Sequence, residues 1–478
     1  MASKTTLNVK NLEALGSARL AQLLFEISTG DANAKRRLRM ELAGAESPGK
    51  LVHEIRKRLS SIGGTATFIG WRSLKGFRTD LNVQRQLIVE QVATAEPAEA
   101  LDLMWQFIGL STGVLERTTD TSGEVIGIFR QACEDIGAIA EAARIDGVAL
   151  ADKAAEAVLG NVYGQCDRLV MVLATALGEA GLIRLRERIL AGADGPETRS
   201  GLRGRKTSRW RRGRKLERDV ERRRARRQIV QMALSEIADA LGDVDAYIAL
   251  QGDRRAPEVA AHIAERLVGA GRAEEALRIL DEVRIGPRAE HPVGLDDARM
   301  AALDAVGRGD EAQALRLAGF HRSLNGAWLR AYIKRLPDFD DIEAEDAALD
   351  LATGYRDVDA ALAFLVDWPA LDRAAQLVLK RAGEIDGGED KVLAPVAEKL
   401  EAKYPLAASV LLRRMIDTVL NNSRSIDYGR AAEQLREAAR LSARIDAFGV
   451  AESHESYVER LRSAHGRKAA FWNAFGED

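Results

Sequence analysis

The chain has 478 residues, which is too long for one compact core and predicts two or more domains or an extended array of repeats. Hydrophobic residues make up 46% and charged residues 30% of the chain, which excludes a disordered polymer, and no uncharged apolar stretch of about 18 residues predicts a membrane-spanning helix. The net charge is −2, and two cysteines exclude a disulfide framework.

Residues 1–193 are expected to form an N-terminal helical domain. Ala, Leu, Arg and Glu dominate the composition, and because these are strong helix formers the predicted fold class is all-α. Apolar residues recur at helical spacing in residues 12–27, 51–59, 101–108 and 126–136, with Gly, Pro, Asp or Ser between the stripes. Short loops between helices of this length predict antiparallel helix pairs.

The start of the chain and its cysteines indicate the compartment. Residues 1–10 are polar and lack the apolar core of a secretory signal peptide. Cys133 and Cys166 are far apart in sequence and form no CxxC metal clip. We therefore expect a cytoplasmic protein in a reducing environment.

Residues 194–228 are expected to form an Arg-rich linker followed by the start of a helix near Arg214. Residues 199–227 contain 15 basic and 3 acidic residues, a net charge of +12 in a chain that is otherwise acidic. Because cations occupy every face of the helix start, we expect its side chains to face solvent and the helix to dock on a core only from Ile229.

This basic segment has three interpretations, which the sequence leaves open. Guanidinium groups bind phosphates and Trp210 is suited to stack on a base, so the first is a nucleic-acid contact. The second is an acidic surface of a partner or of the chain itself, and the third is an inert solvated segment. The candidate polyanion contacts are Arg203, Arg205, Lys206, Arg209, Trp210, Arg211, Arg212, Arg214, Lys215, Arg222, Arg223, Arg224, Arg226 and Arg227.

Residues 229–478 contain a repeat. Residues 267–277 match residues 303–312 at an offset of 36, and residues 351–362 form a looser third copy 48 residues further on. In the closer copies a Gly-Arg turn is expected to end one helix, an acidic residue to start the next, and a small Ala to let the two approach. This pattern predicts tetratricopeptide-like pairs that stack into an α-solenoid with a concave groove. The candidate groove residues, on the first helices of the repeats, are Glu265, Arg266 and Arg299.

Two resemblances cover most of the chain. The chain resembles an uncharacterised bacterial helical-repeat family, a domain of unknown function, in residues 12–21, 34–44, 97–105 and 242–249. The C-terminal half, including residues 457–462 and 465–471, is similar to the tetratricopeptide-like repeat region beside bacterial SWIM zinc fingers, without the zinc-finger cysteines. These resemblances imply a helical-repeat fold and assign no activity.

No motif predicts an enzyme, a metal site or a bound cofactor. The six histidines are scattered, and the acidic run 338–346 lacks the register and the glycine of a calcium loop. In residues 201–207, Arg205 separates the Gly and Lys that a phosphate-binding loop needs side by side. Cys166 has no histidine near it in sequence, so nucleophilic catalysis is not indicated.

We therefore expect a non-enzymatic scaffold or adaptor that binds a protein partner through its helical-repeat groove, without a cofactor or membrane contact. The alternative is a nucleic-acid-binding protein that uses residues 199–227 for sequence-independent phosphate contacts. A third hypothesis is an enzyme with catalytic residues dispersed along the chain. The sequence predicts neither the oligomeric state nor the identity of the partner.

Overall fold

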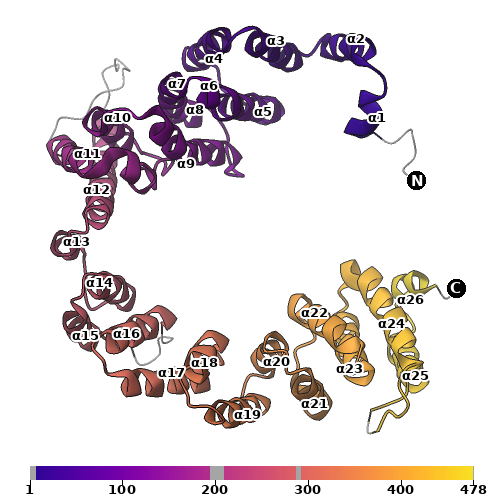
Figure 1. The fold of residues 1–478 in the computed structure, drawn as a ribbon. Helices are drawn as coiled ribbons and strands as arrows, with labels where there is room; N and C mark the ends of the chain where they lie inside the picture. Colours follow the sequence, from indigo (N-terminus) through magenta and orange to yellow (C-terminus); the bar gives the residue numbers. More distant parts are fainter. Residues whose placement is uncertain (1–6, 194–208, 287–291, 450, 477–478) are drawn as a thin grey trace. The chain divides into compact units, whose positions relative to one another are not determined.

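The structure, a computed structural model, describes residues 7–193, 209–286, 292–449 and 451–476, without the side chains of residues 71 and 209–223. Helices account for 77% of it, and the described residues contain no strand, only an isolated bridge between Ile69 and Thr118 (Figure 1). The all-α prediction is confirmed. The chain divides into two compact units, Met1–Arg254 and Arg255–Asp478.

The first unit contains α1 (Val9–Glu13), α2 (Ser17–Ser28), α3 (Ala32–Glu46), α4 (Pro48–Gly63), α5 (Trp71–Leu87), the π-helical turn η1 (Ile88–Val92), α6 (Ala93–Ala95), α7 (Pro97–Gly109), α8 (Ser111–Leu115), α9 (Glu124–Ala143), α10 (Gly147–Leu159), α11 (Leu169–Ala193), α12 (Arg209–Ala240) and α13 (Val244–Leu250).

The second unit contains α14 (Pro257–Gly269), α15 (Ala273–Asp281), α16 (Val293–Ala305), α17 (Gly309–Ser323), α18 (Gly326–Ile333), α19 (Asp340–Thr353), α20 (Val358–Asp367), α21 (Leu371–Arg381), the 3₁₀ turn η2 (Ala382–Glu384), α22 (Asp390–Glu401), α23 (Pro405–Asn421), the 3₁₀ turn η3 (Ser425–Asp427), α24 (Tyr428–Ser442), α25 (His454–His465) and α26 (Ala469–Phe475).

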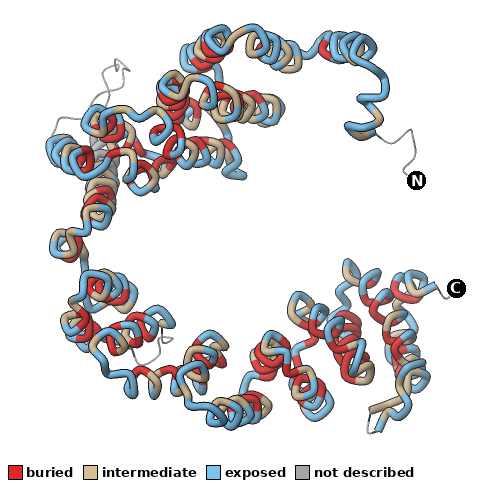
Figure 2. The backbone as a smooth tube through the Cα atoms, viewed as in Figure 1, coloured by how far each residue is buried: buried red, intermediate tan, exposed pale blue. Residues whose placement is uncertain are grey.

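The predicted apolar stripes explain the core of the first unit. Those in residues 51–59, 101–108 and 126–136 fall on α4, α7 and α9, and nearly all of their apolar side chains are buried. The stripe in residues 12–27 forms α1 and α2, but most of its side chains stay exposed, Leu24 by 50%. Figure 2 shows α2 coloured mostly as exposed. Helical periodicity therefore locates a helix correctly without showing that its apolar face is covered.

A close crossing fixes the start of α10 against α11. Asp146 caps α10 by accepting the amide of Ala149 at 3.1 Å. Opposite it, α11 bends at Gly178, whose φ of 58° and ψ of −177° are not helical. A Cβ atom on Gly147 would overlap the carbonyl oxygen of Leu177, so only glycine fits this crossing.

The helix that follows the Arg-rich linker returns to the first unit. From Ile229 onward α12 packs on the apolar core, as expected, with Ala233 and Ile237 buried beside α10 and α11. Since α13 packs in turn on α12, the first unit extends to Arg254. This division lies later in the chain than residues 194–228, which the sequence indicated as the boundary between domains at 1–193 and 229–478.

The two closer repeats of the second unit end their first helices in the same turn. The amide of Arg272 donates to the carbonyl of Leu267 at 2.7 Å, and the amide of Arg308 donates to that of Leu303 at 2.9 Å. The glycine before each arginine is left-handed, with φ of 75° and 81°. The predicted Gly-Arg turn is therefore confirmed at both positions.

The arginine of each turn also pairs with the start of the next helix. Arg272 pairs with Glu275 at 2.8 Å and Arg308 with Glu311 at 2.6 Å, three residues into α15 and α17. The alanine after each glutamate is buried, and α14 packs on both α15 and α16. The two ion pairs lie within single repeats, and the contact between α14 and α16 joins the first repeat to the second.

The third copy uses a different turn. Tyr355 stands where the two closer copies have Gly271 and Gly307, and its backbone is not left-handed. The next helix, α20, is capped by Asp357, whose side chain accepts the amide of Ala360 at 3.0 Å. The looser sequence match thus reflects a change of capping device.

Candidate functional site

The Arg-rich segment continues into α12. Arg203, Arg205 and Lys206 lie outside the described residues. The candidates that lie on α12 without described side chains are Arg209, Trp210, Arg211, Arg212, Arg214, Lys215, Arg222 and Arg223. Arg224 and Arg227 are exposed on the following turn of α12.

Arg226 corrects the expectation that all arginines of this helix face solvent. It is half-buried, and its Nη2 atom donates to the carbonyl oxygen of Gly192 at 2.6 Å. The last carbonyl groups of a helix have no partner within that helix, and Arg226 supplies one for α11. This arginine therefore holds α12 to α11.

The candidate groove residues occupy α14 and α16. Glu265 is exposed on α14, in line with Glu258 and His262 of the same helix face. Arg266 donates to the carbonyl of His262 at 2.9 Å. Arg299 on α16 pairs with Asp281 at the end of α15 at 2.6 Å, so its guanidinium is used within the stack.

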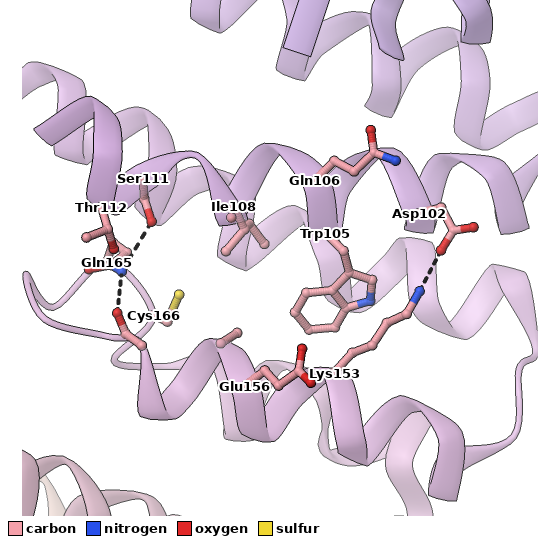
Figure 3. Close-up of a pocket in the computed structure, with 13 residues that line it drawn as sticks. Asp102, Trp105, Gln106, Ile108, Ser111, Thr112, Lys153, Glu156, Gln165 and Cys166 are labelled. Atoms are coloured by element: carbon pink, nitrogen blue, oxygen red, sulfur yellow. Dashed lines mark hydrogen bonds and ion pairs between the residues drawn. The ribbon is translucent and has the colours of Figure 1, made fainter. Parts of the chain in front are cut away.

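A pocket of about 550 Å³ lies between α7 and α10 in the first unit (Figure 3). Each helix contributes residues at positions i, i+3, i+4 and i+7, which share one helix face. These are Asp102, Trp105, Gln106 and Gly109 on α7, and Lys153, Glu156, Ala157 and Gly160 on α10 and just after it. Its volume lies in the range of small-ligand sites, about 300–1,000 Å³.

Polar contacts bridge the pocket at both ends. At one end Lys153 Nζ lies 2.6 Å from Asp102 Oδ1, and at the other Gln165 Nε2 donates to Ser111 Oγ at 3.2 Å (Figure 3). The loop that carries Gln165 is fixed by the buried Asn161, whose side chain accepts the amide of residue 166 at 2.9 Å. Polar contacts therefore lie on both sides of the open middle of the pocket.

The middle of the pocket holds an indole and an unneutralised carboxylate. Trp105 projects between the two helices, and Glu156 reaches into the same space from α10 (Figure 3). Within the described part of the chain, Glu156 has no ion-pair partner and Trp105 Nε1 is buried without a hydrogen-bond acceptor. Gln106 adds an exposed amide at the rim. This combination suits binding of a ligand.

The chain's two cysteines meet behind this pocket. Cys166 lines it, and Cys133 Sγ on α9 lies 3.3 Å from Cys166 Sγ; both are free thiols, each 3% exposed. The hydrogen bond to Cys166, together with burial, raises the pKa of the Cys133 thiol well above its usual range. A thiol held protonated in this way is a packing group and a poor nucleophile.

A second polar cluster in the second unit is structural. Two guanidinium groups contact the Tyr457 ring, those of Arg413 and Arg460, each with its central carbon 4.9 Å from the ring centroid. The Tyr457 hydroxyl donates to Asp417 at 3.1 Å, and burial raises the pKa of that hydroxyl well above its usual value. Arg413 is 6% exposed and donates to the carbonyl of Glu452 at 2.7 Å. This cluster pins α25 to α23.

Sequence reasoning missed the pocket for an identifiable reason. It used residues 101–108 as a core stripe, and the side chains of the pocket lie on the flank of the same helix. The matching spacing of Asp102 and Trp105 with Lys153 and Glu156 was visible in the sequence. That α7 and α10 face each other depends on the fold, and no local pattern carries that information.

The fold and pocket define an all-helical protein built from short helices and tight turns. Comparison with protein families matches residues 2–474, and the chain belongs to this family, described as a family of unknown function (DUF6880). The expected membership of an uncharacterised helical family is thereby confirmed. No curated protein and no solved structure matched.

The described residues contain no group of three or more His, Cys, Asp or Glu side chains placed to bind a metal ion. In the same ranges, no helix has the length and apolar character needed to cross a bilayer.

Proposed function

We propose that this protein is a non-enzymatic adaptor that binds a segment of another protein on its helical repeats. In this proposal the second unit is a tetratricopeptide-like α-solenoid of antiparallel pairs, akin to the repeat region of bacterial SWIM proteins, and it acts in the cytoplasm. The repeated turn between α14 and α15 and between α16 and α17 carries the proposal, because reiterated pairs that stack side by side are typical of proteins that bind peptides along their first helices.

The surface that fits this role is the exposed face of α14. Glu258, His262 and Glu265 follow one another along that face, so a partner segment there would meet a mainly acidic helix. Charge of this kind sets the choice and orientation of a partner more than the affinity. A basic or amphipathic segment is the expected partner.

The test is affinity purification of the full chain from its native host, with and without nuclease, followed by cross-linking of the captured protein. A specific protein partner should survive nuclease treatment and cross-link near α14 and α16. Replacing Glu258 and Glu265 with Lys should weaken capture, whereas Glu398→Lys on the exposed face of α22 should not. A partner that is lost with nuclease, or that ignores the α14 variant, contradicts the proposal.

Nucleic-acid binding is the alternative, and the net charge of +12 in residues 199–227 favours it. Binding would depend little on base sequence, because the segment offers phosphate contacts and no array that reads bases. Replacing Arg222, Arg223, Arg224 and Arg227 with Gln should flatten the salt dependence by about 0.9 in log–log slope per lost duplex phosphate contact. Arg226 is kept, because it holds α12 to α11. No binding by the parent protein at low salt would remove this alternative.

A further inference from the structure

The pocket between α7 and α10 carries an excess of negative charge at its centre. Two carboxylates line it, those of Asp102 and Glu156, against the single ammonium group of Lys153. Because Lys153 is paired with Asp102 at 2.6 Å, the Glu156 carboxylate is the charge that a ligand can neutralise. A cationic group is therefore the complement of this site.

The indole beside that carboxylate narrows the kind of cation. Trp105 is the best aromatic partner for a cation placed over its ring, and guanidinium groups occupy such positions more often than ammonium groups. A guanidinium is planar, so it can stack on the indole while its edge pairs with a carboxylate through two hydrogen bonds. The exposed Gln106 amide offers a further acceptor at the rim.

We infer that this pocket binds an arginine side chain of a partner protein segment, with its guanidinium on Trp105 and against Glu156. The inference rests on the proposed adaptor function. It adds a second contact, in the first unit, that selects a partner segment containing arginine. The polar contacts at the two ends of the pocket are already formed without a ligand, so they need no ordering on binding.

The test uses the full chain and two capped peptides, acetyl-Gly-Arg-Gly-amide and the same peptide with neutral citrulline. Calorimetry at low salt should detect the arginine peptide, and the citrulline peptide should bind at least tenfold more weakly. Glu156→Gln should weaken binding of the arginine peptide at least tenfold. Because Glu156 is exposed, the substitution should leave the fold intact. Glu141→Gln, an exposed glutamate on α9, is the matched control and should bind as the parent does.

A spectroscopic readout places the peptide in the pocket. The protein is labelled with 5-fluorotryptophan at its six tryptophans, and the ¹⁹F signal of Trp105 is assigned as the one that disappears in Trp105→Leu. This signal should shift when the arginine peptide is added. No binding by the parent, equal binding of the citrulline peptide, or unchanged binding by Glu156→Gln would overturn the inference. Free arginine that binds as tightly as the peptide would also overturn it, because the ligand would then be a small molecule.

Failure of this inference and failure of the adaptor function can be told apart. If the peptide does not bind but a nuclease-resistant partner is still captured through α14, the pocket assignment is wrong and the adaptor function stands. If the peptide binds as described and no protein is captured, the adaptor function is wrong and the pocket is a separate arginine site.

Discussion

Glu236 on α12 is a half-buried carboxyl whose surroundings disfavour its charge. Burial, followed by the nearby carboxylate of Asp167, raises the pKa of Glu236 from 4.5 to about 7. Between these two values the folded protein keeps a proton that the unfolded chain has released. The free energy of unfolding therefore falls as pH rises through this window and stays lower above it.

Replacing this carboxyl with an amide should remove that pH dependence. The difference in free energy of unfolding between Glu236→Gln and the parent should shift in favour of the variant by about 1 kcal/mol from pH 5 to pH 8. The shift is this small because solvent screens the half-buried group. Urea unfolding at the two pH values measures the gain, and Glu141→Gln controls for the loss of one carboxylate. An equal effect of Glu236→Gln at both pH values would show that its carboxyl does not titrate in this window.

The two cysteines offer a probe of local opening. Since both thiols are 3% exposed, a thiol reagent should label neither Cys133 nor Cys166 in the native protein in the time that labels both in guanidinium. Cys133→Ala should leave Cys166 protected, because burial and not the pair excludes the reagent. Rapid labelling of Cys166 in the parent would mean that the loop from Gly160 to Arg168 opens readily.

At the scale of single residues, the sequence showed where charged side chains gather but not which groups they contact. The charge of α12 was evident, yet the contact of Arg226 with Gly192 depends on where α11 ends in space. The meeting of Cys133 and Cys166 joins positions 33 residues apart and has no local sequence signal. Long-range contacts of this kind follow from helix packing, which single-residue patterns do not encode.

The repeat turns give a prediction at the scale of elements. Gly271 and Gly307 have left-handed backbones, with φ of 75° and 81°, whereas Gly354 in the third repeat has a φ of −95°. Alanine at a left-handed position is strained, so Gly271→Ala and Gly307→Ala should each lower the free energy of unfolding by about 1 kcal/mol. Gly354→Ala should change it by less than about 0.5 kcal/mol.

Chemical denaturation of the three variants measures these differences. A similar loss in Gly354→Ala would mean that the cost does not come from the left-handed backbone of Gly271 and Gly307. Gly354 lies one position earlier in its turn than Gly271 and Gly307, so it serves as a control for the same substitution at a glycine with an ordinary φ.

Elements were predictable where a local device defines them. The Gly-Arg turns contain their own hydrogen bonds and ion pairs within a few residues, so the sequence located α14 to α17 well. The apolar stripe of α2 was equally regular, but no element among the described residues covers most of it, and periodicity cannot reveal whether a stripe is covered.

At the scale of the whole molecule, the expected first site of proteolysis is the Arg-rich segment and not the division after Arg254. Limited trypsin digestion should cut first between Arg199 and Arg227, where the sequence is rich in Arg and Gly and lacks an apolar face. Residues 260–320 contain packed repeats and should be cut later. Mass spectrometry of the first fragments decides, and a first cut within residues 260–320 would contradict this view.

The sequence indicated two helical parts and an Arg-rich segment between them. It did not indicate that α12 and α13 belong with the first unit, because the apolar residues after Ile229 fit a new domain as well as a returning helix. Which core a helix joins is decided by the shape and burial of the whole unit.

The hydrogen-bonded turns of the second unit also bear on how the chain folds. Each turn closes a loop of only six residues, as between Leu267 and Arg272, and α14 packs on the two helices that follow it in sequence. Contacts this local cost little loop-closure entropy, and chains dominated by them fold fast. Folding of this region can therefore begin at either Gly-Arg turn and spread to its neighbour, without waiting for distant parts of the chain to meet.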